Sequence, residues 1–330
     1  MGWPSLSIVI PTLNMGRFIE RTLLSIFRQN YPGRLQVIVA DGGSKDETVR
    51  ILKRYPQVSW WSRKDNGIAD AVNQGFAQCD GEIIAEQGSD DYYLPGALER
   101  SVGAMMRDRQ LDIVAGTDVF LEADGRRFTC SKIEDHEITP KSLILRRVIP
   151  LHCGFFRRDV LQTTGGMRCF GRAMADSGGN IDNVGLDIDF WYRALHFHKG
   201  RFIPHHTAVY QLHCDQMTVN SPSWYRNMTD MVESCERDPK FASRFTLTVQ
   251  EKQNAYIRWE IQQAKLLGQA ERVENLVRRV MEDSAFTEDT RQHLALHGFV
   301  PKPPRTAPRV PQAAPDIDWW ESEPVVALAG

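Results

Sequence analysis

Short apolar runs alternate with segments of helical periodicity over the first 120 residues. Runs of mainly apolar residues predict buried strands at 6–10, 35–40, 58–61, 82–86 and 112–116. Apolar residues at helical spacing predict helices at 18–27, 45–54 and 68–78, and proline at the first turn predicts another after Pro95. This alternation predicts an α/β fold whose central sheet is mostly parallel and carries helices on both faces.

The pattern changes after residue 120. Asp124-Gly125 stands between two apolar runs and predicts a hairpin turn. An amphipathic helix is expected over 186–198, and two short strands separated by a proline are expected within 201–212. The pattern is then helical over 224–297.

The last thirty residues differ from the rest. Residues 216–298 are expected to form a helical extension that packs on the remainder of the chain, whereas 299–330 are too rich in proline to pack and are expected to be disordered or extended. Trp319-Trp320 would dock as a short anchor on this chain or on a partner. Contact with a membrane surface or with another copy through 216–330 is the alternative.

Composition narrows the class of protein. The chain has 330 residues, 42% of them hydrophobic and 25% charged, which excludes a wholly disordered protein. With 40 Lys and Arg against 42 Asp and Glu, the net charge of −2 gives no sign of a nucleic-acid partner. The sequence holds no run of about 18 apolar residues, and its six cysteines are scattered without a CxxC pair. We therefore predict a cytoplasmic protein, with a peripheral position at the inner face of the membrane as the variant.

Polar loops follow four of the predicted strands. Open α/β sheets bind ligands outside the carboxyl ends of their strands, so these loops are candidate binding segments. Their candidate residues are Pro11, Thr12 and Asn14, then Asp41 and Ser44, then Asp65, Asp70 and Asn73, and last Ser89, Asp90 and Asp91. Taken singly, the loops are also compatible with ordinary strand-to-helix turns, helix caps or solvated surface.

The fourth loop, Gly88-Ser89-Asp90-Asp91, carries two adjacent carboxylates at a strand end. Such a pair is costly unless a positive charge lies between its members. Mg²⁺ and Mn²⁺ prefer oxygen ligands and commonly bridge to phosphates, so Asp90 and Asp91 are candidate ligands for Mn²⁺ or Mg²⁺. The alternative is that the pair caps the helix beginning after Pro95.

Four motifs stand in order along the chain: SIVIPTLN, VIVADGGSKDETV, KDNGIADAVNQG and GSDDYYLPGAL. Together they resemble the family 2 glycosyltransferases of the GT-A fold, and the fit is best to bacterial enzymes that build polysaccharides. The resemblance covers residues 5 to about 215. The GxGxxG fingerprint is absent, which argues against a nicotinamide-dependent enzyme.

The resemblance implies inverting transfer of a sugar from a nucleotide-diphospho-sugar, with UDP the expected nucleotide. The acceptor would be a hydroxyl on a glycan, a lipid-linked molecule or a protein. A carboxylate would act as general base, and a divalent cation would offset the charge on the diphosphate. The segment from Gly185 to Arg193 resembles the one that carries the base, which assigns that role to Asp187. Asp189 is the alternative and would point elsewhere on a helix.

In the same resemblance, the first three motifs hold the donor nucleotide. Asp41 and Asp65 would contact the uridine portion, and Thr12 would contact the nucleotide edge. The resemblance thus implies a catalytic domain over 1–215, with a nucleotide-sugar-binding half at 1–120 and an acceptor half at 121–215.

The cation would be held by Asp90, with Asp91 nearby, and His213 resembles a late histidine that reaches the donor diphosphate or the metal. Two positions depart from the family pattern. Gly88 stands where many relatives have Asp or Asn, and Leu186 replaces a Glu. These departures keep an alternative open: a non-catalytic, nucleotide-sugar-binding or scaffolding member of the same fold.

Overall fold

The structure is a computed structural model, and it describes residues 2–122, 125–129, 135–145, 148–168, 186–216, 224–242, 244, 247–266, 268–288, 290–291 and 326–327. The predicted anchor at Trp319-Trp320 lies outside these residues.

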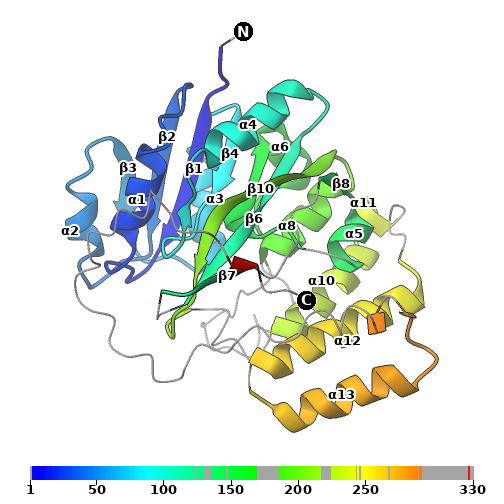
Figure 1. Ribbon diagram of the computed structural model, residues 1–330. Coiled ribbons are helices and arrows are strands. Elements are labelled where there is room, and N and C mark those ends of the chain that lie inside the picture. Colours follow the sequence, from blue (N-terminus) through cyan, green and yellow to red (C-terminus); the bar gives the residue numbers. More distant parts are fainter. Residues whose placement is uncertain are drawn as a thin grey trace.

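A mixed, mostly parallel sheet forms the centre of the fold (Figure 1). Its strands run in the order β11-β7-β6-β9-β4-β1-β2-β3. Their bounds are β1 Leu6–Thr12, β2 Leu35–Asp41, β3 Val58–Ser62, β4 Ile83–Glu86, β6 Ile113–Leu121, β7 Arg127–Thr129, β9 Gly154–Arg157 and β11 Val326–Ala327. Strand β10 (Gly200–Gln211) pairs in parallel with β6 and antiparallel with β5 (Tyr92–Tyr93) and β8 (His136–Ile138).

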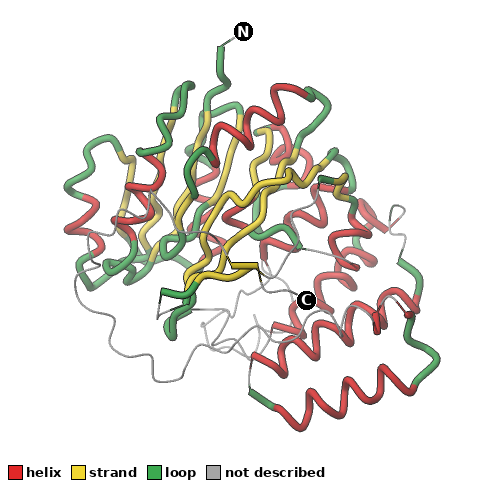
Figure 2. The backbone as a smooth tube through the Cα atoms, viewed as in Figure 1, coloured by secondary structure: helices red, strands yellow, loops and turns green. Residues whose placement is uncertain are grey.

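Helices cover both faces of the sheet, as the alternating pattern predicts (Figure 2). Successive strand residues point to opposite faces, so Ile8 and Ile10 join one apolar cluster and Val9 joins the other. The first cluster includes α1 (Ile19–Phe27), α2 (Thr48–Leu52) and α4 (Ala97–Arg107). The second includes α3 (Ile68–Phe76), α5 (Pro140–Leu145), α6 (Asp159–Thr164) and α8 (Leu186–Leu195). The two clusters give the sheet an apolar core on each side.

The carboxyl ends of the first strands meet at one edge of the sheet. In the parallel pairing of β1 with β2, Thr12 is opposite Asp41, and in that of β2 with β3, Asp41 is opposite Ser62. The loops that follow these strands are therefore neighbours in space, which is the arrangement that ligand binding at such an edge requires.

Two expectations from the sequence are corrected. The segment expected to form two short strands within 201–212 is one continuous strand, β10, whose pairing with β6 shifts register between Phe202 and His206. Pro204 lies in that irregularity, where a missing backbone N–H is tolerated. The helix expected over 45–54 is only α2, because residues 45–47 form a loop. The predicted hairpin is present, with β6 and β7 paired antiparallel through Phe120 and Phe128.

The C-terminal helices pack on the helices that cover one face of the sheet, and on one another (Figure 1). They are α10 (Trp224–Arg237), α11 (Pro239–Ala242), α12 (Val249–Leu266) and α13 (Ala270–Glu282). Met231 of α10 and Trp259 of α12 belong to the same apolar cluster as α8, and α13 packs on α12 through Val280. In the part of the chain described here, no helix has both the length and the apolar character needed to cross a membrane.

Candidate functional site

Asp90 and His213 meet although 123 positions separate them. Asp90 Oδ2 lies 3.0 Å from His213 Nε2. The antiparallel pairing of β5 with β10 brings them together, because Asp90 shortly precedes β5 and His213 shortly follows β10. His213 is buried, its ring lies against Phe18 with 4.6 Å between centroids, and its Nδ1 has no hydrogen-bond partner. This carboxylate–imidazole pair joins two of the residues predicted to serve the cation and the diphosphate.

Asp91 points the other way, into the protein. Its Oδ1 accepts the backbone N–H of Gln211 at 3.0 Å, and its Oδ2 lies 3.2 Å from Nδ1 of His152. The Nε2 of His152 lies 3.4 Å from Oδ2 of Asp118. Burial raises the pKa of Asp91, whereas the neighbouring His152 opposes that rise. Burial alone would lower the pKa of His152, but the surrounding Cys153, Asp91 and Asp118 raise it well above its ordinary value.

Asp187 lies in the first turn of α8 and is partly buried. Burial raises its pKa to about 6, and hydrogen bonds from backbone N–H groups and the charge of His152 oppose the rise. Glu86, at the end of β4, is 2% exposed, and neither of its carboxyl oxygens has a hydrogen-bond partner. Burial first and the charge of Asp187 second raise the pKa of Glu86 well above its ordinary value. A carboxylate with a raised pKa beside a second carboxyl is typical of acid–base sites.

Asp189, the alternative base, is fully buried and fully paired. Its Oδ2 accepts a hydrogen bond from Nε of Arg193 at 2.8 Å, and its Oδ1 accepts one from Nε of Arg168 at 2.9 Å. Arg193 in turn donates to the carbonyl oxygens of Thr164 and Gly166. Asp189 therefore ties α8 to the end of α6, and its oxygens are not open to an acceptor hydroxyl.

The nucleotide side of the predicted site is built around Asp41. Asp41 is 1% exposed, and its carboxylate accepts hydrogen bonds from the Ser44 backbone N–H at 3.0 Å and from the hydroxyls of Ser44 and Ser62. Thr12 lies opposite it on β1, with a buried hydroxyl oxygen that has no partner. Asp65, in the loop after β3, lies against the loop after β2: a Cβ added at Gly42 would be 2.9 Å from Asp65 Oδ2.

The remaining residues of the predicted donor site have structural partners. Pro11 is buried within β1, opposite Ala40. Asn14 accepts the backbone N–H of Lys45 at 2.8 Å through its side chain, and its own backbone N–H donates to the Ser44 hydroxyl at 2.7 Å. These bonds tie the first loop to the second.

Three more of them stabilise other parts of the structure. Asp70 accepts the backbone N–H of Asn66 at 3.0 Å, which lowers its pKa. Asn73 exchanges two hydrogen bonds of 2.8 Å with the backbone of Met167. Ser89 is buried, and its carbonyl oxygen accepts the Thr22 hydroxyl at 3.0 Å. Asp70, Asn73 and Ser89 therefore already have a local structural role.

Steric crowding explains why position 88 is a glycine. A Cβ at this position would lie 2.8 Å from Asp91 Oδ2 and 3.0 Å from Asp90 Oδ1. Real Cβ atoms essentially never approach another atom within 3.0 Å. The glycine thus leaves room beside the loop backbone for the carboxylates of both Asp90 and Asp91.

The residues present fit a divalent cation that is completed by other ligands. Within the described residues, no three His, Cys, Asp or Glu side chains are arranged to hold a metal ion together. The carboxylate of Asp90 and the imidazole of His213 are ligand types that Mn²⁺ accepts, and Nδ1 of the histidine has no hydrogen-bond partner. Donor phosphates would supply further oxygens.

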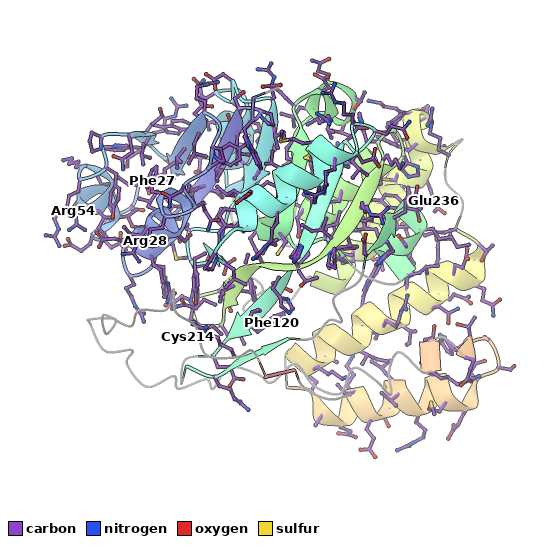
Figure 3. All side chains as sticks on the ribbon, turned by 45° about the horizontal axis from the view of Figure 1, so that its top comes forward. Phe27, Arg28, Arg54, Phe120, Cys214 and Glu236 are labelled. Atoms are coloured by element: carbon purple, nitrogen blue, oxygen red, sulfur yellow. The ribbon has the colours of Figure 1, made fainter. Side chains whose placement is uncertain are left out.

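Three residues around Asp91 and Asp187 received no individual role from the sequence: Glu86, Asp118 and His152, the last of which only begins a segment that resembles the family's acceptor-side segment. Glu86 ends β4, Asp118 lies within β6 and His152 directly precedes β9, so an ionisable residue in or beside an apolar run was the available signal. His152 also stacks on Tyr210, whose ring meets that of Phe120 at 5.5 Å. Figure 3 labels Phe120 at this end of β6, near Cys214, which follows β10.

Known proteins resemble this chain in sequence and in fold. A family model described as Glycosyl transferase family 2 matches residues 7–165. The chain is 33% identical over 126 residues to a chondroitin synthase of Escherichia coli, an alignment that covers 37% of this chain and only 18% of that protein's length. It is 30% identical over 187 residues to a PGL/p-HBAD biosynthesis glycosyltransferase of Mycobacterium bovis, covering 55% of this chain and 70% of that protein.

Solved structures share the fold. The crystal structure of S. aureus TarS 1-349 in complex with UDP-GlcNAc superposes with a TM-score of 0.58 at 17% identity, over 89% of this chain and 90% of that chain. The mannosyltransferase PcManGT from Pyrobaculum calidifontis, in complex with GDP-Man and Mn²⁺, gives a TM-score of 0.56 at 16% identity, over 88% and 79%. The expected GT-A fold class is thereby confirmed. The family match and the mycobacterial relative together show that the chain belongs to glycosyl transferase family 2 and is, by family, a glycosyltransferase.

Proposed function

We propose that the chain is an inverting glycosyltransferase of glycan or polysaccharide synthesis, which moves a sugar from a UDP-sugar to an acceptor hydroxyl. The observation that carries the proposal is the environment of Asp187. Its carboxyl lies partly buried in the first turn of α8, and burial raises its pKa to about 6. Such a group is ionised at neutral pH and still basic enough to take a proton. The acceptor would be a glycan, a lipid-linked molecule or a protein.

We infer the following reaction from these assigned roles. Asp187 takes the proton of the acceptor hydroxyl while the hydroxyl oxygen attacks the anomeric carbon. The bond from that carbon to the diphosphate breaks, and its electron pair leaves with the diphosphate. Attack from the face opposite the leaving group inverts the configuration. Asp90 and His213 would hold a Mn²⁺ or Mg²⁺ ion, which when bound offsets the charge on the diphosphate.

The nucleotide would lie along the carboxyl ends of β1, β2 and β3. Asp41 would contact the base of the nucleotide there, and hydrogen bonds from Ser44 and Ser62 hold its carboxylate in one orientation. The unpartnered hydroxyl of Thr12 and the carboxylate of Asp65 border the same edge. TarS binds UDP-GlcNAc and PcManGT binds GDP-Man in their crystal structures. We therefore rank UDP-sugars first and GDP-sugars second as candidate donors.

Release of nucleoside diphosphate from a panel of UDP- and GDP-sugars with Mn²⁺ tests the proposal. We expect turnover that requires an acceptor and falls at least 100-fold in Asp187→Asn. Full activity of that variant with a true acceptor would refute the assigned base. Donor binding in calorimetry without turnover on any acceptor would instead support the non-catalytic alternative that Gly88 and Leu186 left open.

A further inference from the structure

His152 occupies an unusual place beneath the Asp90-Asp91 loop. It lies in the 3₁₀ turn Leu151–Cys153 directly before β9 and is only 6% exposed. Its ring is stacked on Tyr210, with 5.4 Å between centroids and 15° between planes. The ring is therefore held in one orientation, with one edge toward the loop after β4 and the other toward β6.

Both ring nitrogens of His152 face carboxylates. Nδ1 lies 3.2 Å from Asp91 Oδ2 and Nε2 lies 3.4 Å from Asp118 Oδ2. Nδ1 is the nearer of the two nitrogens to a carboxylate oxygen, whereas Nε2 makes no hydrogen bond and lies only at ion-pair distance from Asp118. Cys153, Glu86 and Asp187 are the other ionisable groups whose charge acts on this ring or is affected by it. Any positive charge on the His152 ring would be compensated by these acidic neighbours, as a buried charge must be.

This contact fixes the direction of Asp91. Its second oxygen is taken by the Gln211 N–H, and its backbone carbonyl accepts the Thr22 hydroxyl at 2.6 Å. The Asp91 side chain is 4% exposed, whereas that of the adjacent Asp90 is 20% exposed. Of the two neighbouring carboxylates, one is therefore held by the protein interior and the other faces outward to His213.

We propose that His152 is a positioning residue of the cation site, which holds Asp91 inside the protein so that Asp90 alone is presented to the cation and the donor diphosphate. The proposal rests on the proposed function for the identity of the ligand. It divides the acidic pair into one ligand, Asp90, and one anchor, Asp91. His152 would act on the cation through Asp91.

Two substitutions of His152 separate its two contacts. The amide nitrogen of Asn stands near the place of Nδ1, so His152→Asn keeps a donor toward Asp91, and that of Gln stands near Nε2, so His152→Gln keeps one toward Asp118. We expect Mn²⁺ affinity, measured by calorimetric titration in the presence of UDP, to fall at least 10-fold in His152→Gln and about threefold or less in His152→Asn. Asp90→Asn should abolish Mn²⁺ binding.

The Asp91→Asn variant gives the matched comparison. It should weaken Mn²⁺ binding as His152→Gln does, and the double variant should be no worse than either single one, because both remove the same contact. Loss of Mn²⁺ in Asp91→Asn as complete as in Asp90→Asn, with both His152 variants binding like wild type, would make Asp91 a ligand and overturn the proposal. If His152→Asn and His152→Gln lost Mn²⁺ affinity equally, and in proportion to their loss of thermal stability, His152 would have only a structural role. That result would also overturn the proposal.

Failure of the proposed function has a different signature. If the wild-type chain bound neither UDP nor Mn²⁺, the proposed function would fail and the cation role of His152 with it. The same double-mutant cycle, measured by urea unfolding, then reports the contact alone: coupling between His152 and Asp91 supports the orientation of Asp91, and additive losses of stability refute it.

Discussion

Replacing Asp187 by Asn should make the protein more stable and inactive. The folded protein holds the Asp187 carboxyl with a pKa of about 6 against an ordinary 3.8. The folded state thus binds this proton more tightly than the unfolded state, and ionisation costs stability as the pH rises from about 4 to about 6. The difference between these two pKa values corresponds to about 3 kcal/mol at neutral pH. Asn removes the buried charge and keeps the shape of the side chain.

Urea unfolding at two pH values tests this reasoning. At pH 7.5, Asp187→Asn should gain up to about 3 kcal/mol over wild type, and the gain should shrink to about 1 kcal/mol at pH 4.5, where the wild-type carboxyl is protonated in the folded state. Glu233→Gln, which neutralises an exposed carboxylate of α10, should change stability by no more than about 0.5 kcal/mol at either pH. A loss of stability at pH 7.5, or a gain that does not depend on pH, would refute the argument.

Three further outcomes follow from the described contacts. The kcat/KM of nucleoside-diphosphate release should fall tenfold per pH unit below about 6, since Asp187 must be ionised to act as base, and a limb near pH 4 would contradict its raised pKa. Asp189→Asn should cost about 3–5 kcal/mol in urea unfolding, because it leaves the buried guanidinium of Arg193 and the partly buried one of Arg168 without this carboxylate. Gly154→Ala should lower the unfolding free energy by about 1–3 kcal/mol, because its Cβ would lie 2.3 Å from Cζ2 of Trp191, and unchanged stability would show that the indole moves freely.

The sheet and its helices could be predicted because the central strands are buried on both faces. Strand β1 is buried at every position, so its apolar run is continuous and easily recognised. Pro204 misled the prediction for β10, because its effect depends on the neighbouring strand. A register shift against β6 accommodates the proline, and a shift of this kind cannot be seen in one sequence.

The site was predictable only as far as its residues stand in sequential motifs. Asp90 and Asp187 belong to such motifs, whereas partners from distant segments decide what each residue does. Asn73 stands in a motif, yet its amide is used by the backbone of Met167, 94 residues away. His152 shows the reverse case, since its role arises only where β6 and β9 meet the loop after β4.

The departure at Gly88 and the buried His152 belong to one arrangement. A side chain at position 88 would collide with Asp91 Oδ2, the same oxygen that faces His152 Nδ1. A carboxylate at 88 would therefore displace Asp91 from its contact and add a negative charge to a cluster that already holds several. Gly88 offers no oxygen ligand of its own. Because it has no side chain, Asp91 can point inward, and Asp90 faces His213. On this reasoning Gly88→Asp should reduce Mn²⁺ affinity in the presence of UDP, although it adds a ligand, and a gain in affinity would show that the loop has room for both carboxylates.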